Sequence, residues 1–217
     1  MNRRHAPDPA AAALQSLLPP VGGVPRVPPA PVRQLRPLAR LVAVVSGRLT
    51  GTEPTAIFTT LGRHPRLFRA WLRYSAHLMP FGSLPRRDSE LIILRVAWQC
   101  RAVYEWWHHV PLALRAGLTA EEIAGIADVN GDAALSERQH VLVAITDGLL
   151  EDRALSDATW QAARRIVTDR EAIEVCLLIG HYQGLASAIG GLAIQLERDL
   201  GPEVTPGSPI ADDTATG

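Results

Sequence analysis

The chain has 217 residues, and 47% of them are apolar, which is enough to bury the core of a single domain. Its 22 cationic side chains, all arginine, balance 22 acidic ones, and no basic run exceeds two residues, so binding to the phosphate backbone of nucleic acids is not expected. The absence of lysine excludes Schiff-base catalysis through a lysine amine.

The two ends of the chain have compositions that disfavour regular structure. Residues 1–34 are rich in proline and alanine. Because proline breaks helices, we expect a flexible arm there, with at most a short helix near residues 10–18. Residues 201–217 contain three prolines and many small polar residues, so we expect a flexible tail. A helical domain should therefore occupy residues 35–200.

Several features favour a cytoplasmic protein. The N-terminus lacks the apolar stretch that a secretory signal peptide requires, and we identify no long uncharged apolar window that would predict a membrane span. Cys100 and Cys176 form no C-x-x-C motif, which fits a reducing compartment. We expect a small-molecule substrate as partner, with no nucleic acid and no membrane.

Between the ends, apolar residues recur at helical spacing almost throughout. A first helix is expected over about 38–47. The next two should begin near Pro54 and Pro65, because proline is tolerated in a first helical turn. The apolar run 91–98 could form a strand on local grounds, but its neighbours favour a buried helix. Arg95 within this run needs a buried acidic partner or a position at the rim.

The second half of the domain shows recognisable helix ends. Gly117 is a typical C-terminal cap for a helix over about 104–116. Residues that accept hydrogen bonds from a first helical turn mark four further helix starts, at Thr119 (a capping box with Glu122), Ser136, Ser156 and Thr168. The sequence shows no alternating strand pattern, phosphate-binding loop or repeat. We therefore expect an all-α bundle of about seven or eight helices.

The side chains most suited to catalysis lie in the middle of the chain. Glu105 and His109 are four residues apart, so they share one face of a helix, and such a pair can transfer protons near neutral pH. Because Glu105 can accept the imidazole proton of His109, we expect His109 rather than His108 to be the catalytic histidine. Glu90, on the preceding helix, is either at the helix end in water or buried with a partner. Tyr104 and His108 are possible supporting residues.

Each of these features also has a structural interpretation. A Glu–His pair at this spacing is more often a solvated surface pair, and Glu90 alone could be a first-turn partner of the helix dipole. The tryptophans are more typical of a core or a subunit seam than of a ligand site, at Trp98, Trp106 and Trp107. A buried trio lining a cavity would favour catalysis, whereas an exposed pair without a cavity would favour a non-catalytic protein.

The same segment resembles the motif of the carboxymuconolactone decarboxylase and alkyl hydroperoxidase D superfamily. In the hydroperoxidase branch, a glutamate precedes C-x-x-C by twelve residues. A histidine lies four residues after the second cysteine, and a glycine follows eight residues later. Matching that glycine to Gly117 places the histidine on His109 and the glutamate on Glu90. The two cysteine positions then fall on Ala102 and Glu105.

The resemblance covers roughly residues 36–200 and includes the phrases His64-Pro65-Arg66-Leu67 and Gly180-His181-Tyr182, which are similar to a subgroup without C-x-x-C. It implies the alkyl hydroperoxidase D-like helical bundle and assembly into homo-oligomers. Thiol peroxidase chemistry needs a peroxidatic and a resolving cysteine, and Ala102 and Glu105 supply neither.

Without the two cysteines, the residues of this segment that can still carry chemistry are those suited to proton transfer, namely Glu90, Glu105 and His109. This set suits decarboxylation, isomerisation or hydration of a small lactone or keto-acid, with no metal and no organic cofactor. The leading hypothesis is a cofactor-free lyase or isomerase. The alternatives are a hydroperoxidase-type oxidoreductase that uses Cys100 and a non-catalytic binding or scaffold protein.

Overall fold

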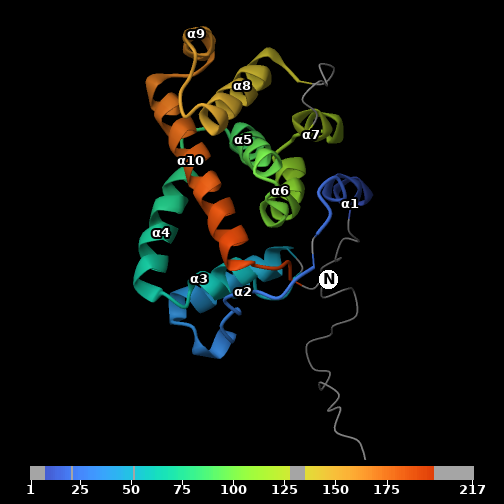
Figure 1. Cartoon of the computed structure of the whole chain (residues 1–217), viewed down its shortest axis with the longest axis vertical. Helices are drawn as coiled ribbons and strands as arrows, with labels where there is room; N and C mark the ends of the chain where they lie inside the picture. The colour runs from blue at the N-terminus through green and yellow to red at the C-terminus, as the bar shows by residue number, and fades with distance from the viewer. Residues whose placement is uncertain (1–7, 21, 51, 128–134, 198–217) are drawn as a thin grey trace, which may run out of the picture.

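The computed structural model describes residues 8–20, 22–50, 52–127 and 135–197 (Figure 1). The tail expected over 201–217 lies outside these residues. Over the described part the chain forms ten α-helices and no strand, which confirms the all-α class, with more helices than the expected seven or eight. They are α1 (Pro9–Gln15), α2 (Pro37–Thr50), α3 (Ala56–Leu61), α4 (Pro65–Leu78), α5 (Arg86–Gln99), α6 (Val103–Arg115), α7 (Ala120–Ala127), α8 (Glu137–Glu151), α9 (Asp157–Ile166) and α10 (Asp169–Leu192).

Helix α5 forms the centre of the bundle and packs against α6, α7, α8 and α10 (Figure 1). Its apolar run from Leu91 to Leu94 is completely buried. A helix that is apolar on all sides must be surrounded by other elements, and this explains why the run has no amphipathic pattern. The prediction of a buried helix over 91–98 is confirmed, apart from partial exposure of Trp98.

Local sequence signals set the ends of the surrounding helices. Gly117 has a φ of +93°, a left-handed conformation that favours glycine, and it follows the last turn of α6. The backbone N–H of Thr119 donates to the Glu122 side chain (2.9 Å), and the N–H of Glu122 donates to the Thr119 hydroxyl (3.2 Å), which forms the predicted capping box. The predicted caps Ser136, Ser156 and Thr168 also accept hydrogen bonds from the first turns of their helices.

Arg95, which is buried in an apolar run, has an acidic partner that is itself partly exposed. Its guanidinium forms two hydrogen bonds of 2.7 Å with the carboxylate of Asp147 on α8, and a third of 2.7 Å with the carbonyl oxygen of Ile126 on α7. Bidentate pairing satisfies a charge that would be costly to bury alone. This contact connects three helices of the core.

The N-terminal segment is docked against the bundle, in contrast to the flexible arm expected over residues 1–34. The indole nitrogen of Trp106 donates to the carbonyl oxygen of Leu14 (2.9 Å), and that of Trp107 donates to the carbonyl oxygen of Leu18 (2.9 Å). Both leucines are buried in the main core. Proline limits helix length, but it does not prevent apolar contact, and a buried indole N–H needs an acceptor. The expectation is corrected for the described part of the arm.

Helix α10 is longer and more apolar than expected from the sequence, in which no apolar window predicted a membrane span. Residues 175–196 contain no Asp, Glu or Arg, although polar side chains such as His181 interrupt this apolar stretch. By length and composition alone, α10 is the one described helix that could cross a membrane, and 28% of its apolar window is buried in the protein.

The docking of the N-terminal segment predicts a difference between two neighbouring leucines. Replacing the buried Leu14 (6% exposed) with alanine removes core packing and should destabilise the protein by about 2–5 kcal/mol. This should lower the Tm by about 5 °C or more in thermal unfolding. The matched control is Leu17→Ala, since Leu17 is 43% exposed and its loss should cost little. Small, equal shifts in both variants would show that the segment is not docked.

Candidate active site

The central contact of the candidate site joins Glu90 on α5 to His109 on α6. Glu90 is completely buried, and its Oε2 lies 2.7 Å from Nδ1 of His109, whose side chain is 11% exposed. One turn before Glu90, the Arg86 guanidinium lies 2.7 Å from the other carboxylate oxygen, at ion-pair distance. Of the two positions considered for Glu90, the structure therefore shows the buried one with partners.

Glu105 does not accept the imidazole proton of His109, and this corrects the pairing expected from their spacing. It shares α6 with His109, but Glu90 reaches Nδ1 from the neighbouring helix. Both carboxyl oxygens of Glu105 are buried and have no hydrogen-bond partner among the described residues. Sequence spacing identifies residues on one helical face, but it does not show that a side chain from a neighbouring helix, here Glu90, forms the hydrogen bond instead.

Burial raises the pKa of Glu105 well above its ordinary value. An unpaired carboxylate in the protein interior would be very costly, so the group takes up a proton instead. Burial therefore favours the neutral, protonated form of the Glu105 carboxyl. The completely buried Glu90, in contrast, is paired with Arg86 and His109.

Tyr182 on α10 completes the surroundings of His109. The two rings are edge to face, with centroids 5.2 Å apart and an interplanar angle of 88°. Burial raises the pKa of Tyr182 well above its ordinary value, and negative charge on Glu90, and on Glu105 when that group is ionised, raises it further. The phenol therefore lies within electrostatic range of both carboxyl groups. In the sequence, Tyr182 stands out only as part of the phrase Gly180-His181-Tyr182, and Arg86 was not predicted as a site residue. The four-residue spacing from Arg86 to Glu90 is the signal that could have identified Arg86.

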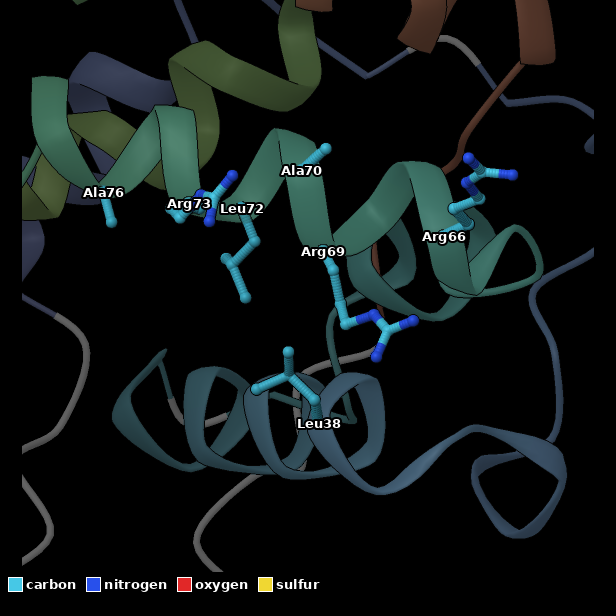
Figure 2. Close-up of a pocket in the computed structure, with 7 residues that line it drawn as sticks. All are labelled: Leu38, Arg66, Arg69, Ala70, Leu72, Arg73 and Ala76. Carbon is cyan, nitrogen blue, oxygen red and sulfur yellow. The ribbon is translucent and has the colours of Figure 1, made fainter.

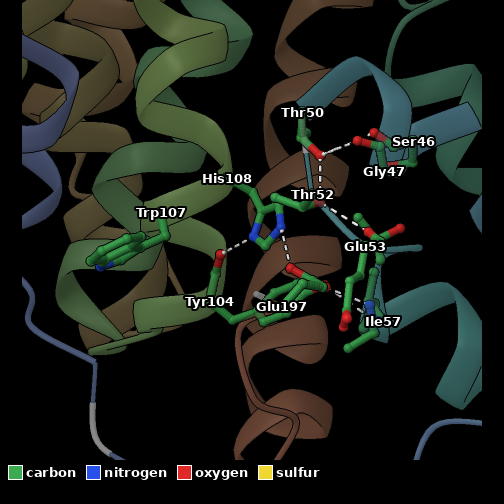
Figure 3. A network of polar contacts seen from close by, with 12 residues as sticks. Ser46, Gly47, Thr50, Thr52, Glu53, Ile57, Tyr104, Trp107, His108 and Glu197 are labelled. Carbon is green, nitrogen blue, oxygen red and sulfur yellow. Dashed lines mark hydrogen bonds and ion pairs between the residues drawn. The ribbon is translucent and has the colours of Figure 1, made fainter. Parts of the chain in front are cut away.

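His108 and Tyr104 belong to a different polar network, which Figure 3 shows. His108 Nε2 lies 3.0 Å from Oε2 of Glu197, and its Nδ1 lies 2.8 Å from the carbonyl oxygen of Tyr104. The Tyr104 hydroxyl and the Ala56 backbone N–H both donate to Oε1 of Glu197. The two adjacent histidines thus contact different glutamates. This network connects α3, α6 and the segment after α10.

The pKa of Glu197 reflects these partners. Burial raises it, but the hydrogen bonds and charge of His108, with the Tyr104 and Ala56 donors, outweigh that effect and leave the pKa below its ordinary value. The satisfied hydrogen bonds indicate a structural role for Tyr104 and His108. The structure does not bring them together with Glu90 and His109, and Glu197 was not identified from the sequence.

Two cavities are described, and neither is lined by Glu90, Glu105 or His109. A cavity of about 630 Å³ lies between α2 and α4 (Figure 2). A smaller one of about 160 Å³ is bordered by Glu197 and by residues around α3. Among the described residues, no group of three or more His, Cys, Asp or Glu side chains is arranged to hold a metal ion.

The comparisons with known proteins agree with this architecture. Residues 65–148 match the carboxymuconolactone decarboxylase family. Solved structures share the fold: an alkylhydroperoxidase AhpD core protein from Ralstonia eutropha is 18% identical with a TM-score of 0.68, and the match covers 81% of this chain and 94% of that one. A peroxidase-related protein from a Silicibacter species is 14% identical with a TM-score of 0.69, covering 82% and 96%.

A third similar structure is the debrominase Bmp8 in complex with 2,3,4-tribromopyrrole, which is 17% identical with a TM-score of 0.68, covering 82% of this chain and 94% of that one. No curated protein matches the sequence. The match of residues 65–148 to the family model agrees with the resemblance predicted from the motif, and the solved structures show that the chain has an AhpD-like fold. The matched segment contains Glu90, Glu105 and His109.

The raised pKa of Glu105 predicts a pH dependence of stability. A carboxyl whose pKa is raised by folding stabilises the protein most below its unfolded pKa, and this contribution is lost as pH rises through the folded pKa. In the wild type, this effect lowers the free energy of unfolding by at most about 1.4 kcal/mol per pH unit. The variant Glu105→Gln keeps the shape of the side chain but does not titrate, so this decrease should be absent from it. Urea unfolding from pH 5 upward measures it.

The matched control for this experiment is Glu137→Gln, because Glu137 is exposed on α8. We expect this variant to keep the pH dependence of the wild type. If Glu105→Gln also keeps it, Glu105 is ionised in the folded protein and its assignment as a neutral acid is wrong.

Proposed function

We propose that this protein is a cofactor-free acid–base enzyme, a decarboxylase-type lyase or an isomerase that acts on a small lactone or keto-acid. The observation that carries the proposal is Glu105, a buried carboxyl without any hydrogen-bond partner among the described residues. Leaving a buried polar group unsatisfied costs about 1–3 kcal/mol, and strongly perturbed carboxyls gather at functional sites. Its neighbourhood supports this interpretation, since Glu90 and His109 lie close to the same tyrosine.

The proposed roles follow from the hydrogen bond between Glu90 and His109. With Nδ1–H donated to the Glu90 carboxylate, Nε2 of His109 carries the free lone pair and serves as the base. It accepts a proton from the carbon next to the substrate carbonyl, and the electron pair of that C–H bond forms an enolate. The neutral Glu105 then donates its proton to another carbon of the enolate, which gives the isomerised product. The proton on His109 is then lost to solvent and Glu105 takes one up, which restores the starting state of the enzyme.

Decarboxylation would use the same residues. The C–C bond to the substrate carboxylate breaks and carbon dioxide leaves. The electron pair of that bond stays on the substrate and forms the enolate, which Glu105 protonates. The Glu90 carboxylate orients the imidazole throughout. Substrate would reach the site from the side of Arg86 and His109, because Arg86 is partly exposed and His109 is the least buried of the three proposed catalytic residues.

Peroxidase chemistry is the less favoured alternative for this chain. The positions that match the family's cysteines are Ala102 and Glu105. Burial raises the pKa of the Cys100 thiol, and an ionised Glu105 would raise it further, so the nucleophilic thiolate is disfavoured. A non-catalytic protein is favoured by one observation, namely that neither described cavity is lined by the proposed catalytic residues.

The test is a comparison of variants of the two adjacent histidines on a panel of lactones and keto-acids. We expect His109→Ala to lower kcat by about two to four orders of magnitude, the usual effect of losing a positioned acid–base group. His108→Ala should have a much smaller effect, because His108 contacts Glu197 instead. Product formation would be followed by chromatography or by release of carbon dioxide.

A parallel assay of peroxide consumption with Cys100→Ser separates the alternatives. The proposal requires that the serine variant keep its activity on the lactone and keto-acid panel. Loss of a peroxidase activity in this variant, with no turnover of the panel, would support the oxidoreductase. Negligible and equal effects of both histidine variants would support a non-catalytic protein.

A further inference from the structure

The cavity of about 630 Å³ is an open groove between α2 and α4 (Figure 2). Neither Glu90 nor His109 is among the residues that line it. Leu38 of α2 and Leu72 of α4 extend toward each other across it. The groove is lined by Leu38, Arg66, Arg69, Ala70, Leu72, Arg73 and Ala76. Its surface therefore combines apolar side chains with three cationic ones.

The three arginines form a row along α4. They are spaced by three and four residues, so they lie on one helical face and extend over about 10 Å. Among the described residues, no carboxylate pairs with Arg66, Arg69 or Arg73. The surrounding sequence offers few acidic partners, because residues 9–87 contain eleven arginines and one acidic residue, Glu53. The row is thus an uncompensated strip of positive charge.

The facing helix α2 presents a complementary apolar row. Leu38, Leu41 and Val45 are exposed large hydrophobic residues spaced by three and four, and Leu41 is 61% exposed. Leu67 at the start of α4 is also exposed. Isolated exposed apolar residues are common, but a helical stripe of them beside a groove is typical of a surface that binds a partner.

We propose that this groove binds an amphipathic α-helix of a partner protein, with the apolar face of the helix on α2 and an acidic flank against α4. Side chains on a helix repeat every three and four residues, which is the spacing of both rows. A single carboxylate or phosphate group would occupy one or two guanidinium groups and leave the rest of the row unpaired. A lipid surface would favour a convex face rather than a groove. The inference does not depend on the proposed catalytic function.

The probe is a synthetic 18-residue fluorescein-labelled helical peptide, with leucines along one face and three glutamates spaced by three and four residues on its flank. Its matched control carries glutamine in place of the three glutamates. In fluorescence anisotropy with the full chain, the acidic peptide should bind at least tenfold more tightly than the control peptide. Added salt should weaken this binding, because exposed charges are screened.

Protein variants locate the binding surface. The triple variant Arg66→Gln, Arg69→Gln, Arg73→Gln should lose at least tenfold in affinity for the acidic peptide. The matched control removes the same charge elsewhere, with Arg115→Gln, Arg164→Gln and Arg165→Gln, and should bind like the wild type. Circular dichroism of both variants checks that they are folded.

Four results would overturn the proposal. Equal binding of the two peptides, or equal loss in the two variants, would show that the arginine row does not select an acidic helix. Binding to phosphatidylglycerol vesicles without binding to the peptide would assign the surface to an anionic membrane. An oligomer that the α4 triple variant converts to monomers in sedimentation velocity would make a second copy of this chain the occupant.

Discussion

The hydrogen bond between Glu90 and His109 connects the two helices around which the candidate site is built. It places a completely buried carboxylate against an imidazole, and α5 and α6 must pack closely for the two side chains to meet. The apolar run of α5 makes that packing favourable, and Arg86 supplies positive charge on the other side of the carboxylate. Every role proposed for the site depends on this contact, because it fixes which imidazole nitrogen remains free.

Glu105 gives the site its chemical asymmetry. Two carboxyl groups lie near one tyrosine, yet one is paired and the other has no partner among the described residues. In the proposed mechanism the paired Glu90 orients His109, which is the base, and the unpaired Glu105 is the acid. Glu105 stands where the hydroperoxidase branch of the resembling family has a cysteine, so this chain has a carboxyl group in place of a thiol.

The sequence predicted the helices better than it predicted contacts between them. Caps such as Thr119 and Gly117 are local signals, and the structure reproduces them. The partner of His109 is not local, since it depends on how α5 and α6 pack. The docking of Leu14 could not be predicted for a similar reason. The composition of the N-terminal segment shows that its prolines limit helix formation, but it does not show which part of the protein the segment contacts. Glu197 lies near the end of the described chain, and nothing in its local sequence links it to His108.

The central claim is that Glu105 is a neutral acid in the folded protein at neutral pH. The most direct test is a pH titration of the side-chain carboxyl carbons by NMR, on protein labelled with ¹³C-glutamate, with the Glu105 signal assigned from its absence in Glu105→Gln. The structure predicts that the Glu105 signal keeps the chemical shift of a protonated carboxyl at pH 7. A Glu105 signal that titrates at the ordinary pKa of glutamate would contradict the account.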